Sequence, residues 1–181
     1  GVSVNLFTPA FVKWTDGGGK YGLTQQTKYP LDNKVQINVS GSRSAEYTVY
    51  VRIPGWTTSD AVLSVNGNRV SGPVQPGTFA AIRRTWKDGD RVELELPMPL
   101  RLEPVDANHP HLVALMRGPL VLFAVADSQP GFDKAELLRA QLANNAAGDA
   151  TATSADGKSI SMRPYMSIKD ESYSTYVQLK S

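Results

Sequence analysis

Short segments in which apolar and polar residues alternate strictly dominate the first half of the chain. The clearest of them place apolar side chains at Val2, Val4 and Leu6, at Val35, Ile37 and Val39, at Tyr47, Val49, Val51 and Ile53, and at Val92, Leu94 and Leu96. A period of two puts such side chains on one face of a strand, while intervening residues such as Glu93 and Glu95 point to the other face. The pattern predicts antiparallel strands with one buried and one solvated face.

Turn signals separate these segments at short intervals. The Asn66-Gly67 dipeptide lies between the apolar residue Val65 and the pair Arg69-Val70. A type I′ turn needs positive φ at both central positions, so this dipeptide predicts a β-hairpin. Residues 16–19 (DGGG) and 88–90 (DGD) indicate two further strand connections. Short strands with frequent turns are typical of a β-sandwich or barrel.

A cluster of prolines divides the chain into two predicted domains. Pro97, Pro99, Pro104 and Pro110 crowd one segment, and we expect no central strand there because proline cannot donate to a ladder. We place the boundary in this segment, with one domain over residues 1–107 and a second over residues 108–181. Beyond it, residues 111–116 and 120–126 are largely apolar, which predicts two strands more fully buried than the earlier ones.

One segment of the second domain has a helical pattern. In residues 133–143, Asp133 fits an N-cap, Glu136 fits its capping partner, and Leu138 and Leu142 lie four apart on one face. The small, polar residues 144–158 predict a mobile loop, and two closing strands follow. The predicted fold class is all-β: two antiparallel, jelly-roll-like β-sandwich domains in tandem, with one short helix in the second.

Composition narrows the possible partners. The chain has 181 residues, of which 41% are hydrophobic and 20% charged, and its net charge of +2 is dispersed along the sequence. This distribution argues against a nucleic-acid partner and against a basic membrane-binding surface. The strongly apolar run at residues 118–126 is far shorter than the roughly 20 residues of a membrane helix, so we expect no membrane partner. The chain begins Gly1-Val2, without a Met or an apolar leader, which favours a processed chain or a piece of a larger one.

Candidate catalytic and metal-binding groups are few. The absence of cysteine excludes thiol catalysis, thiolate zinc sites and disulfides. His109 and His111 flank Pro110, and we interpret this pair as part of a linker, because no acidic cluster or cysteine accompanies it. Glu93 and Glu95 share a strand face, but the solvated face of a sheet is where such charges usually lie. We therefore expect no catalytic, cofactor-binding or metal-binding residue in this chain.

The tryptophans are the remaining candidates for ligand binding. We expect Trp56 and Trp86 to be buried, because a large aromatic residue is usually part of a small core. Trp14 is the best candidate for stacking on a sugar ring, because the polar residues around it indicate a wet strand end. A carbohydrate-binding domain that uses exposed aromatic residues is therefore one open alternative. A second open alternative is that this chain is itself a hydrolase, with a pair of catalytic carboxylates that the sequence pattern does not reveal.

Five short motifs follow one another along the chain. They are Arg52-Ile53-Pro54-Gly55-Trp56, Val65-Asn66-Gly67, residues 84–90 (RTWKDGD), Leu96-Pro97-Met98-Pro99 and residues 117–121 (RGPLV). In this order and spacing they resemble the C-terminal part of the β-L-arabinofuranosidase family, glycoside hydrolase family 127. Residues 4–7 (VNLF) and 23–30 (LTQQTKYP) are similar to the family's stretch after its catalytic domain, and residues 163–165 and 173–176 match more loosely.

The resemblance implies an accessory region without the active site. Family members have an (α/α)₆-barrel catalytic domain with a cysteine nucleophile and a zinc site of cysteines and a glutamate, followed by two β-sandwich domains. None of those functional residues maps onto this chain, because it has no cysteine. The resemblance implies a non-catalytic region that braces the missing barrel of the same parent protein, with no cofactor in this chain and zinc in that barrel.

The signature residues of the motifs have structural explanations. They are Arg52, Pro54, Gly55, Trp56, Asn66, Gly67, Trp86, Gly89 and Asp90. Pro54 is expected to end a strand, Gly55 to permit a bend, and Trp56 to fold back over the core. Trp86 is expected to lie in the core beneath the turn at residues 88–90.

Overall fold

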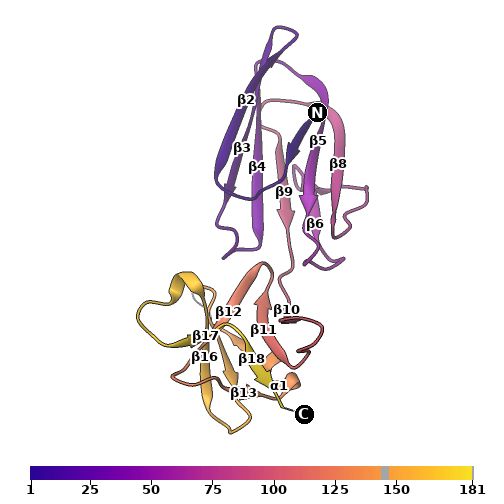
Figure 1. Ribbon diagram of the computed structural model, residues 1–181. Helices are drawn as coiled ribbons and strands as arrows, with labels where there is room; N and C mark the ends of the chain where they lie inside the picture. The colour runs from indigo at the N-terminus through magenta and orange to yellow at the C-terminus, as the bar shows by residue number, and fades with distance from the viewer. Residues whose placement is uncertain (144–146, 181) are drawn as a thin grey trace. The chain divides into compact units, whose positions relative to one another are not determined.

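The computed structural model describes residues 1–143 and 147–180. The chain divides into two compact units, unit 1 (Gly1–Met98) and unit 2 (Pro99–Ser181), and both are built almost entirely of strands (Figure 1). The all-β prediction is confirmed. Within the described ranges, no helix combines the length and the apolar character needed to cross a bilayer.

Unit 1 consists of two sheets. The smaller sheet has the order β1 (Val2–Val4), β5 (Ala45–Ile53), β8 (Thr78–Trp86). The larger sheet has the order β2 (Ala10–Asp16), β3 (Gly19–Thr27), β4 (Lys34–Gly41), β9 (Arg91–Glu95), β6 (Val62–Val65), β7 (Asn68–Arg69). Neighbouring strands are antiparallel except β1, which runs parallel to β5. This pairing places the alternating segments of the sequence on facing sheets.

The core of unit 1 is made of the apolar residues of the alternating segments. Ile37 of β4, Val49 of β5 and Val92 of β9 are fully buried, and Leu63 of β6 joins them from the same sheet as β4 and β9. Full burial of an aliphatic side chain of this size contributes about 1.5–3 kcal/mol. The two-residue period therefore accounts both for the strands and for their inward face.

Unit 2 is built around one sheet, and its strands are short. They are β10 (Leu100–Pro104), β11 (Leu112–Arg117), β12 (Leu120–Val125), β13 (Gly131–Phe132), β14 (Gln141–Leu142), β15 (Ala150–Thr153), β16 (Ser159–Pro164), β17 (Tyr173–Ser174) and β18 (Val177–Leu179). The main order is β13-β18-β11-β12-β16-β15-β14, with β10 paired to β11 and β17 paired to β12. The described strands thus form one hydrogen-bonded sheet, whose core includes Leu115, Leu122, Phe132 and Met162.

The proline-rich segment belongs to unit 2 from Pro99 onward. Strand β10 lies in it and pairs along its whole length with β11, from Leu100 opposite Arg117 to Pro104 opposite Val113. A proline at the end of a strand is tolerated more readily than one in the middle of a central strand. The chain therefore divides after Met98, earlier than the boundary expected after residue 107.

The helix is shorter than the sequence pattern predicts. Helix α1 spans Lys134–Leu138, and Asp133 occupies the N-cap position without a side-chain cap hydrogen bond. Leu137 is the buried residue, whereas Leu138 and Leu142 are exposed. The prediction of a helix over residues 133–143 with Leu138 and Leu142 on one face is therefore wrong, because the helix ends at Leu138. Its last turn is replaced because Gln141 and Leu142 form β14, which pairs with β15.

The loop expected at residues 144–158 also contains a strand. Residues 150–153 form β15, which pairs with β14 on one side and β16 on the other. Ala150 and Ala152 are buried, while Thr151 and Thr153 are exposed. Buried and exposed residues therefore alternate along β15, but alanine is so small that the sequence does not mark these positions as clearly apolar. Residues 144–146 of the expected loop lie outside the described residues.

Candidate functional site

The hairpin at Asn66-Gly67 has the backbone that its sequence predicts. Asn66 has φ of 52° and Gly67 has φ of 79°, both positive as a type I′ turn requires. Val65 of β6 pairs with Asn68 of β7 across the turn. A Cβ at Gly67 would meet nothing within 4 Å, so a substitution there would be opposed by backbone strain alone.

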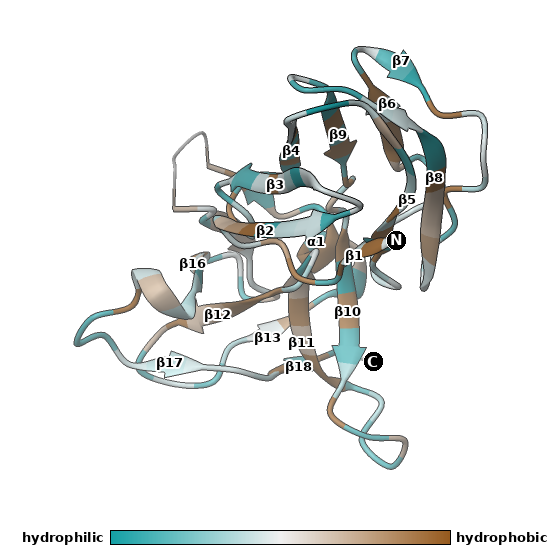
Figure 2. Cartoon of the chain, turned by 90° about the horizontal axis from the view of Figure 1, so that it is seen from above, coloured by the Kyte–Doolittle hydropathy of each residue, from teal (hydrophilic) through white to brown (hydrophobic). Residues whose placement is uncertain are grey.

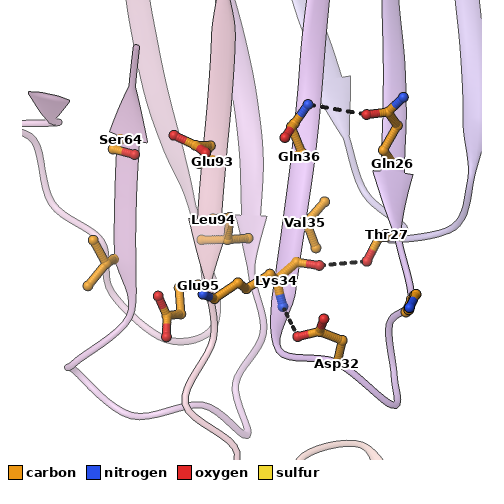
Figure 3. A pocket seen from close by; sticks show the side chains of 12 residues that line it. Gln26, Thr27, Asp32, Lys34, Val35, Gln36, Ser64, Glu93, Leu94 and Glu95 are labelled. Carbon is orange, nitrogen blue, oxygen red and sulfur yellow. Dashed lines mark hydrogen bonds between the residues drawn. The ribbon is translucent and has the colours of Figure 1, made fainter. Parts of the chain in front are cut away.

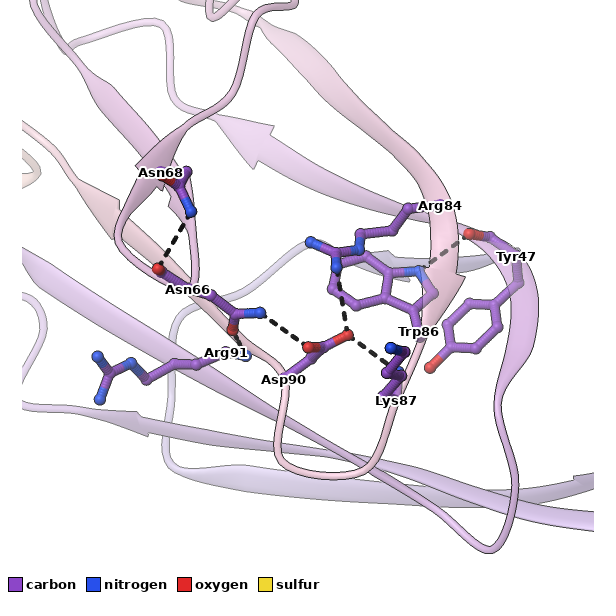
Figure 4. A network of polar contacts seen from close by, with 8 residues as sticks. All are labelled: Tyr47, Asn66, Asn68, Arg84, Trp86, Lys87, Asp90 and Arg91. Carbon is purple, nitrogen blue, oxygen red and sulfur yellow. Dashed lines mark hydrogen bonds and ion pairs between the residues drawn. The ribbon is translucent and has the colours of Figure 1, made fainter.

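A buried carboxylate connects this hairpin to the turn between β8 and β9 (Figure 4). Asp90 is 7% exposed. The Asn66 side-chain amide donates to Asp90 Oδ1 at 2.8 Å, and the Lys87 backbone N–H donates to Oδ2 at 2.9 Å. The Arg84 guanidinium lies 3.7 Å from Oδ2. The Asn66 side-chain oxygen in turn accepts from the Arg91 backbone N–H at 2.8 Å, so one asparagine holds both turns in register.

The electrostatics of Asp90 follow from these contacts. Burial on its own would raise the pKa of Asp90, but the hydrogen bonds from Asn66 and Lys87, together with the charge of Arg84, outweigh it and hold the pKa below 3.8. Burial, followed by the negative charge of Asp90, raises the pKa of the neighbouring Tyr47. Asp90 is therefore a charged group that stabilises a junction of two turns, and Gly89 supplies the positive φ of 83° beside it.

Trp86 lies in the core beneath this junction. It is 1% exposed, and its indole N–H donates to the Tyr47 backbone oxygen at 3.0 Å. The Arg84 guanidinium lies over the indole ring, 5.2 Å from its centroid. The prediction that Trp86 is buried is confirmed. Its position explains the Arg84 to Asp90 motif without any reacting group.

The Pro54-Gly55-Trp56 segment follows directly after β5. Pro54 is buried, and its carbonyl accepts from the Thr57 backbone N–H at 3.3 Å. Gly55 is not among the described residues with positive φ, so this bend does not depend on the conformational freedom of glycine. Trp56 is only partly buried and stacks on Tyr29 with ring centroids 6.3 Å apart. The prediction of full burial is therefore wrong for Trp56, because part of its ring covers the edge of the core. The remaining signature residue, Arg52, is exposed on β5.

Trp14 lies at the opposite end of the same aromatic cluster as Trp86. It is partly buried and contacts Tyr21 and Tyr47, with ring centroids 5.8 and 5.6 Å away. One side of Trp14 lines a groove of about 450 Å³, which Lys20 and Asp88 also line. The ring is therefore accessible along this groove, and a role in sugar contact stays a proposal.

The histidine pair does not form a metal centre with neighbouring residues. The His109 Nδ1 lies 2.8 Å from a carboxylate oxygen of Asp106, and both side chains are largely exposed. Within residues 1–143 and 147–180, no group of three or more His, Asp or Glu side chains is placed to hold a metal ion. The pair belongs to the connection between β10 and β11.

A polar groove of about 440 Å³ runs along the outer face of the larger sheet of unit 1 (Figure 3). It is lined by Gln26, Thr27, Lys28, Asp32, Lys34, Val35, Gln36, Val62, Ser64, Glu93, Leu94 and Glu95. The ladder sets Gln36 and Ser64 on either side of Glu93, and Lys34 and Val62 on either side of Glu95. The groove therefore brings together the two carboxylates that the sequence places on one strand face.

The surroundings of these carboxylates do not suit glycoside hydrolysis. Arg91 lies 3.4 Å from Glu93, and the Asn33 side chain donates to Glu95 at 3.3 Å. A general acid for glycoside cleavage needs an apolar environment that keeps it protonated. The open, charged sheet face offers none, so the geometry favours a solvated surface, as expected from the strand pattern.

Unit 2 contains a partly exposed cluster of aromatic rings that the sequence pattern does not predict. Phe123, Tyr165 and Tyr173 contact one another there, although they lie up to 50 residues apart in the sequence. The available signal was that residues 120–126 are apolar on both faces, which implies a second surface to be covered. The pattern predicts a strand more fully buried than the earlier ones, but Val121, Phe123 and Val125 on its outer face are only partly buried.

Comparisons with known proteins agree on one family. A model of the β-L-arabinofuranosidase GH127 middle domain matches residues 1–98, which are unit 1. A non-reducing end β-L-arabinofuranosidase of Bifidobacterium longum subsp. longum is 33% identical over an alignment of 120 residues, and the match covers 61% of this chain and 18% of that protein. The chain therefore spans less than a fifth of this curated relative.

Solved structures show the same fold. A GH127 β-L-arabinofuranosidase from Geobacillus stearothermophilus T6 matches 98% of this chain and 33% of its own length, with 23% identity and a TM-score of 0.75. A second structure, described as a glycoside hydrolase, matches 99% of this chain and 36% of its own length, with 21% identity and a TM-score of 0.77. The family model covers more than half of the chain, and the motifs quoted from the sequence lie mostly inside it. This chain belongs to the β-L-arabinofuranosidase family, glycoside hydrolase family 127, and its residues 1–98 form the family's middle domain.

Proposed function

We propose that this chain is the non-catalytic β-sandwich region of a longer glycoside hydrolase related to the β-L-arabinofuranosidases. In this role it braces an (α/α)₆-barrel catalytic domain of the same protein, which would carry the zinc. Two observations support the assignment: the matching family model describes a middle domain, and the solved relatives extend well beyond the region they share with this chain. The chain also lacks the cysteines of the family's nucleophile and zinc ligands.

The observation that carries the proposal is an uncovered apolar face in unit 1. The smaller sheet has three strands and the larger sheet six. Trp14 of β2 packs against Tyr47 of β5, but the first four residues of β2 are exposed. Val12 lies opposite the buried Leu23 but is itself 45% exposed, and Leu6 is 69% exposed. Phe11 is 73% exposed and starts from the other side of the edge strand, opposite Thr24. Together Leu6, Phe11 and Val12 line a groove of about 350 Å³. Exposed apolar patches of this kind mark interaction surfaces in soluble proteins.

The expected partner of this face is the catalytic domain. A domain can keep an apolar surface when its partner belongs to the same polypeptide, because that surface then stays covered and is not exposed to water. The experiment introduces Leu6→Asp and Phe11→Asp separately, both into this chain and into the longer protein that carries it. Each variant is compared with the corresponding original protein. Thermal unfolding of this chain should change little, because both side chains are already exposed. Thermal unfolding of the longer protein should occur several degrees lower.

A matched control distinguishes docking from a general effect of new charge. Phe79 is also exposed but lies on β8 of the smaller sheet, so Phe79→Asp should leave the longer protein unchanged. If Leu6→Asp and Phe11→Asp also leave the unfolding temperature of the longer protein unchanged, the apolar face is not the contact with the catalytic domain, and the bracing function loses its support.

A second candidate function is carbohydrate binding at Trp14. The observation that favours it is the groove beside this ring, where Lys20 and Asp88 supply polar groups next to an aromatic edge. Because the Trp14 ring already contacts Tyr21 and Tyr47, a sugar would stack on the part of the ring that these tyrosines leave exposed. Binding of arabino-oligosaccharides that is lost in Trp14→Phe would support this function.

A further inference from the structure

Unit 2 has a cluster of three aromatic rings on the outer face of its sheet, of which two are exposed and one is partly buried. We define this aromatic platform as Phe123 of β12, Tyr165 of the short 3₁₀ turn η1 (Tyr165–Ser167), and Tyr173 of β17. Phe123 and Tyr173 meet edge to face with centroids 5.2 Å apart, and Tyr165 lies 5.9 Å from Phe123 and 6.4 Å from Tyr173. Tyr165 is 66% exposed and Tyr173 is 44% exposed. These rings hold one another in place while leaving ring surface open to solvent.

The register of the sheet explains why these rings gather. Strand β12 is apolar along its whole length (Figure 2), with Leu122 and Ala124 in the core and Phe123 and Val125 on the outer face. On one side of β12, Arg163 lies opposite Phe123. On its other side, Tyr173 lies opposite Val125. The platform is therefore assembled by strand pairing, from segments far apart in the sequence.

A fixed pair of polar groups lies next to the platform. The Arg163 guanidinium donates to Glu171 at 2.7 Å and to the Ser161 hydroxyl at 3.1 Å. The second carboxylate oxygen of Glu171 accepts from the Lys169 backbone N–H at 2.8 Å. Both side chains are about one-third exposed. Guanidinium N–H groups and carboxylate oxygens are thus presented beside the rings, and the two charges cancel.

We propose that the aromatic platform of unit 2 binds a neutral saccharide. The rings of Tyr165 and Tyr173 stack against the C–H face of a sugar, and Arg163 and Glu171 donate to and accept from its hydroxyl groups. An apolar surface with a few convergent, pre-oriented polar groups is the general design of small-ligand sites. Because Arg163 and Glu171 neutralise each other, the site favours an uncharged sugar over a uronic acid or a phosphorylated one.

The size of the platform favours a saccharide over a protein partner. A stable protein–protein interface buries about 800 Å² on each side. Three aromatic side chains supply about 450–750 Å² even when they are fully exposed. All three are already partly covered, Tyr165 by about one-third, Tyr173 by about half and Phe123 the most. The area matches one or two sugar rings better than a protein surface. The saccharide proposal rests on the proposed function only for its probes, which contain arabinose because the chain belongs to an arabinofuranosidase family.

The test is native affinity electrophoresis of this chain in gels that contain sugar-beet arabinan, arabinogalactan or arabinoxylan, followed by titration calorimetry with oligosaccharides of the retarding polymer. We expect retardation by at least one of the three polymers. Tyr165→Ala and Tyr173→Ala should each weaken binding at least tenfold, because each removes a stacking ring. Tyr165→Phe should keep most of the affinity, and Glu171→Gln should weaken it several-fold by releasing Arg163.

The control is Tyr50→Ala, which removes an exposed tyrosine from β5 of unit 1 and should leave binding unchanged. Circular dichroism and thermal unfolding confirm that each variant is folded. Absence of retardation in all three gels overturns the proposal, and so does retardation that is equal in Tyr165→Ala and the original chain. A platform used for protein contact would give no retardation but a lower unfolding temperature for Tyr165→Ala in the longer protein. None of these outcomes bears on the face at Leu6 and Phe11, so the proposed function is tested separately.

Discussion

Replacing Asn66 with alanine should disconnect the two turns that meet at Asp90. The variant loses the 2.8 Å hydrogen bond to the buried carboxylate and the 2.8 Å bond from the Arg91 backbone. A hydrogen bond to a charged group contributes about 1.5–3 kcal/mol and a neutral one about 0.5–1.5 kcal/mol, and bonds in one network do not add fully. We therefore expect Asn66→Ala to lower the free energy of unfolding of unit 1 by about 2–3 kcal/mol at pH 7.

The loss should depend on pH in a defined direction. The folded-state pKa of Asp90 lies below 3.8, so its contacts contribute stability that is present above the unfolded pKa of 3.8 and disappears as the pH falls through the folded value. In Asn66→Ala, one of the bonds that lower this pKa is absent. The difference in stability between the two proteins should therefore shrink steadily as the pH is lowered below 3.8.

Urea unfolding followed by tryptophan fluorescence isolates this effect. Trp14, Trp56 and Trp86 all lie in unit 1, so the signal reports on that unit alone. The control is Asn68→Ala, which changes an exposed asparagine of the same hairpin and should cost less than about 0.5 kcal/mol. A loss for Asn66→Ala as small as that of the control, or one equal at pH 7 and in acid, would refute the assignment of Asp90 as the charged centre of the junction.

Three further predictions test the remaining assignments. Gly67→Val should lower the unfolding free energy by about 1–3 kcal/mol in the same urea assay, because a β-branched residue resists the positive φ of this turn. Trp86→Ala should cost about 3–5 kcal/mol and Trp56→Ala clearly less, since its ring is only partly buried; equal losses would contradict the difference in burial. The purified chain should neither retain zinc in equimolar amount nor cleave an aryl β-L-arabinofuranoside above background, with or without added zinc. Turnover that survives repurification and disappears in Glu93→Gln would overturn the non-catalytic assignment, and the longer protein serves as the positive control.

The sequence predicted unit 1 more completely than unit 2, and the reason is side-chain size. In β4, β5 and β9 the inward positions are Val, Ile and Leu, so a period of two is visible. In β15 the inward positions are Ala150 and Ala152, which look like part of a polar loop. The segment after Asp133 has good helix formers, but pairing of Gln141 and Leu142 with β15 overrides that local preference.

The candidate sites also differ in how far local sequence predicts them. The Asn66-Gly67 turn follows from its dipeptide, which favours one turn type, and the burial of Trp86 follows from its place in an alternating strand. The aromatic platform could not be found that way, because Phe123, Tyr165 and Tyr173 meet only after β12 has paired with both β16 and β17. A strand that is apolar on both faces was the one local sign that a second surface existed.

Both units therefore carry apolar surface that their own cores do not use, and the physical cause differs between them. In unit 1 a three-stranded sheet faces a six-stranded one, and the exposed large residues Leu6, Phe11 and Val12 are aliphatic or phenyl groups. In unit 2 the exposed rings are the two phenols of Tyr165 and Tyr173, which lie near a fixed arginine–glutamate pair. Exposed aliphatic and phenyl groups suit burial against another domain, whereas rings beside a fixed pair of hydrogen-bonding groups suit a ligand that is itself half apolar and half hydroxylated. That difference in chemistry is why we assign bracing to the first surface and saccharide binding to the second.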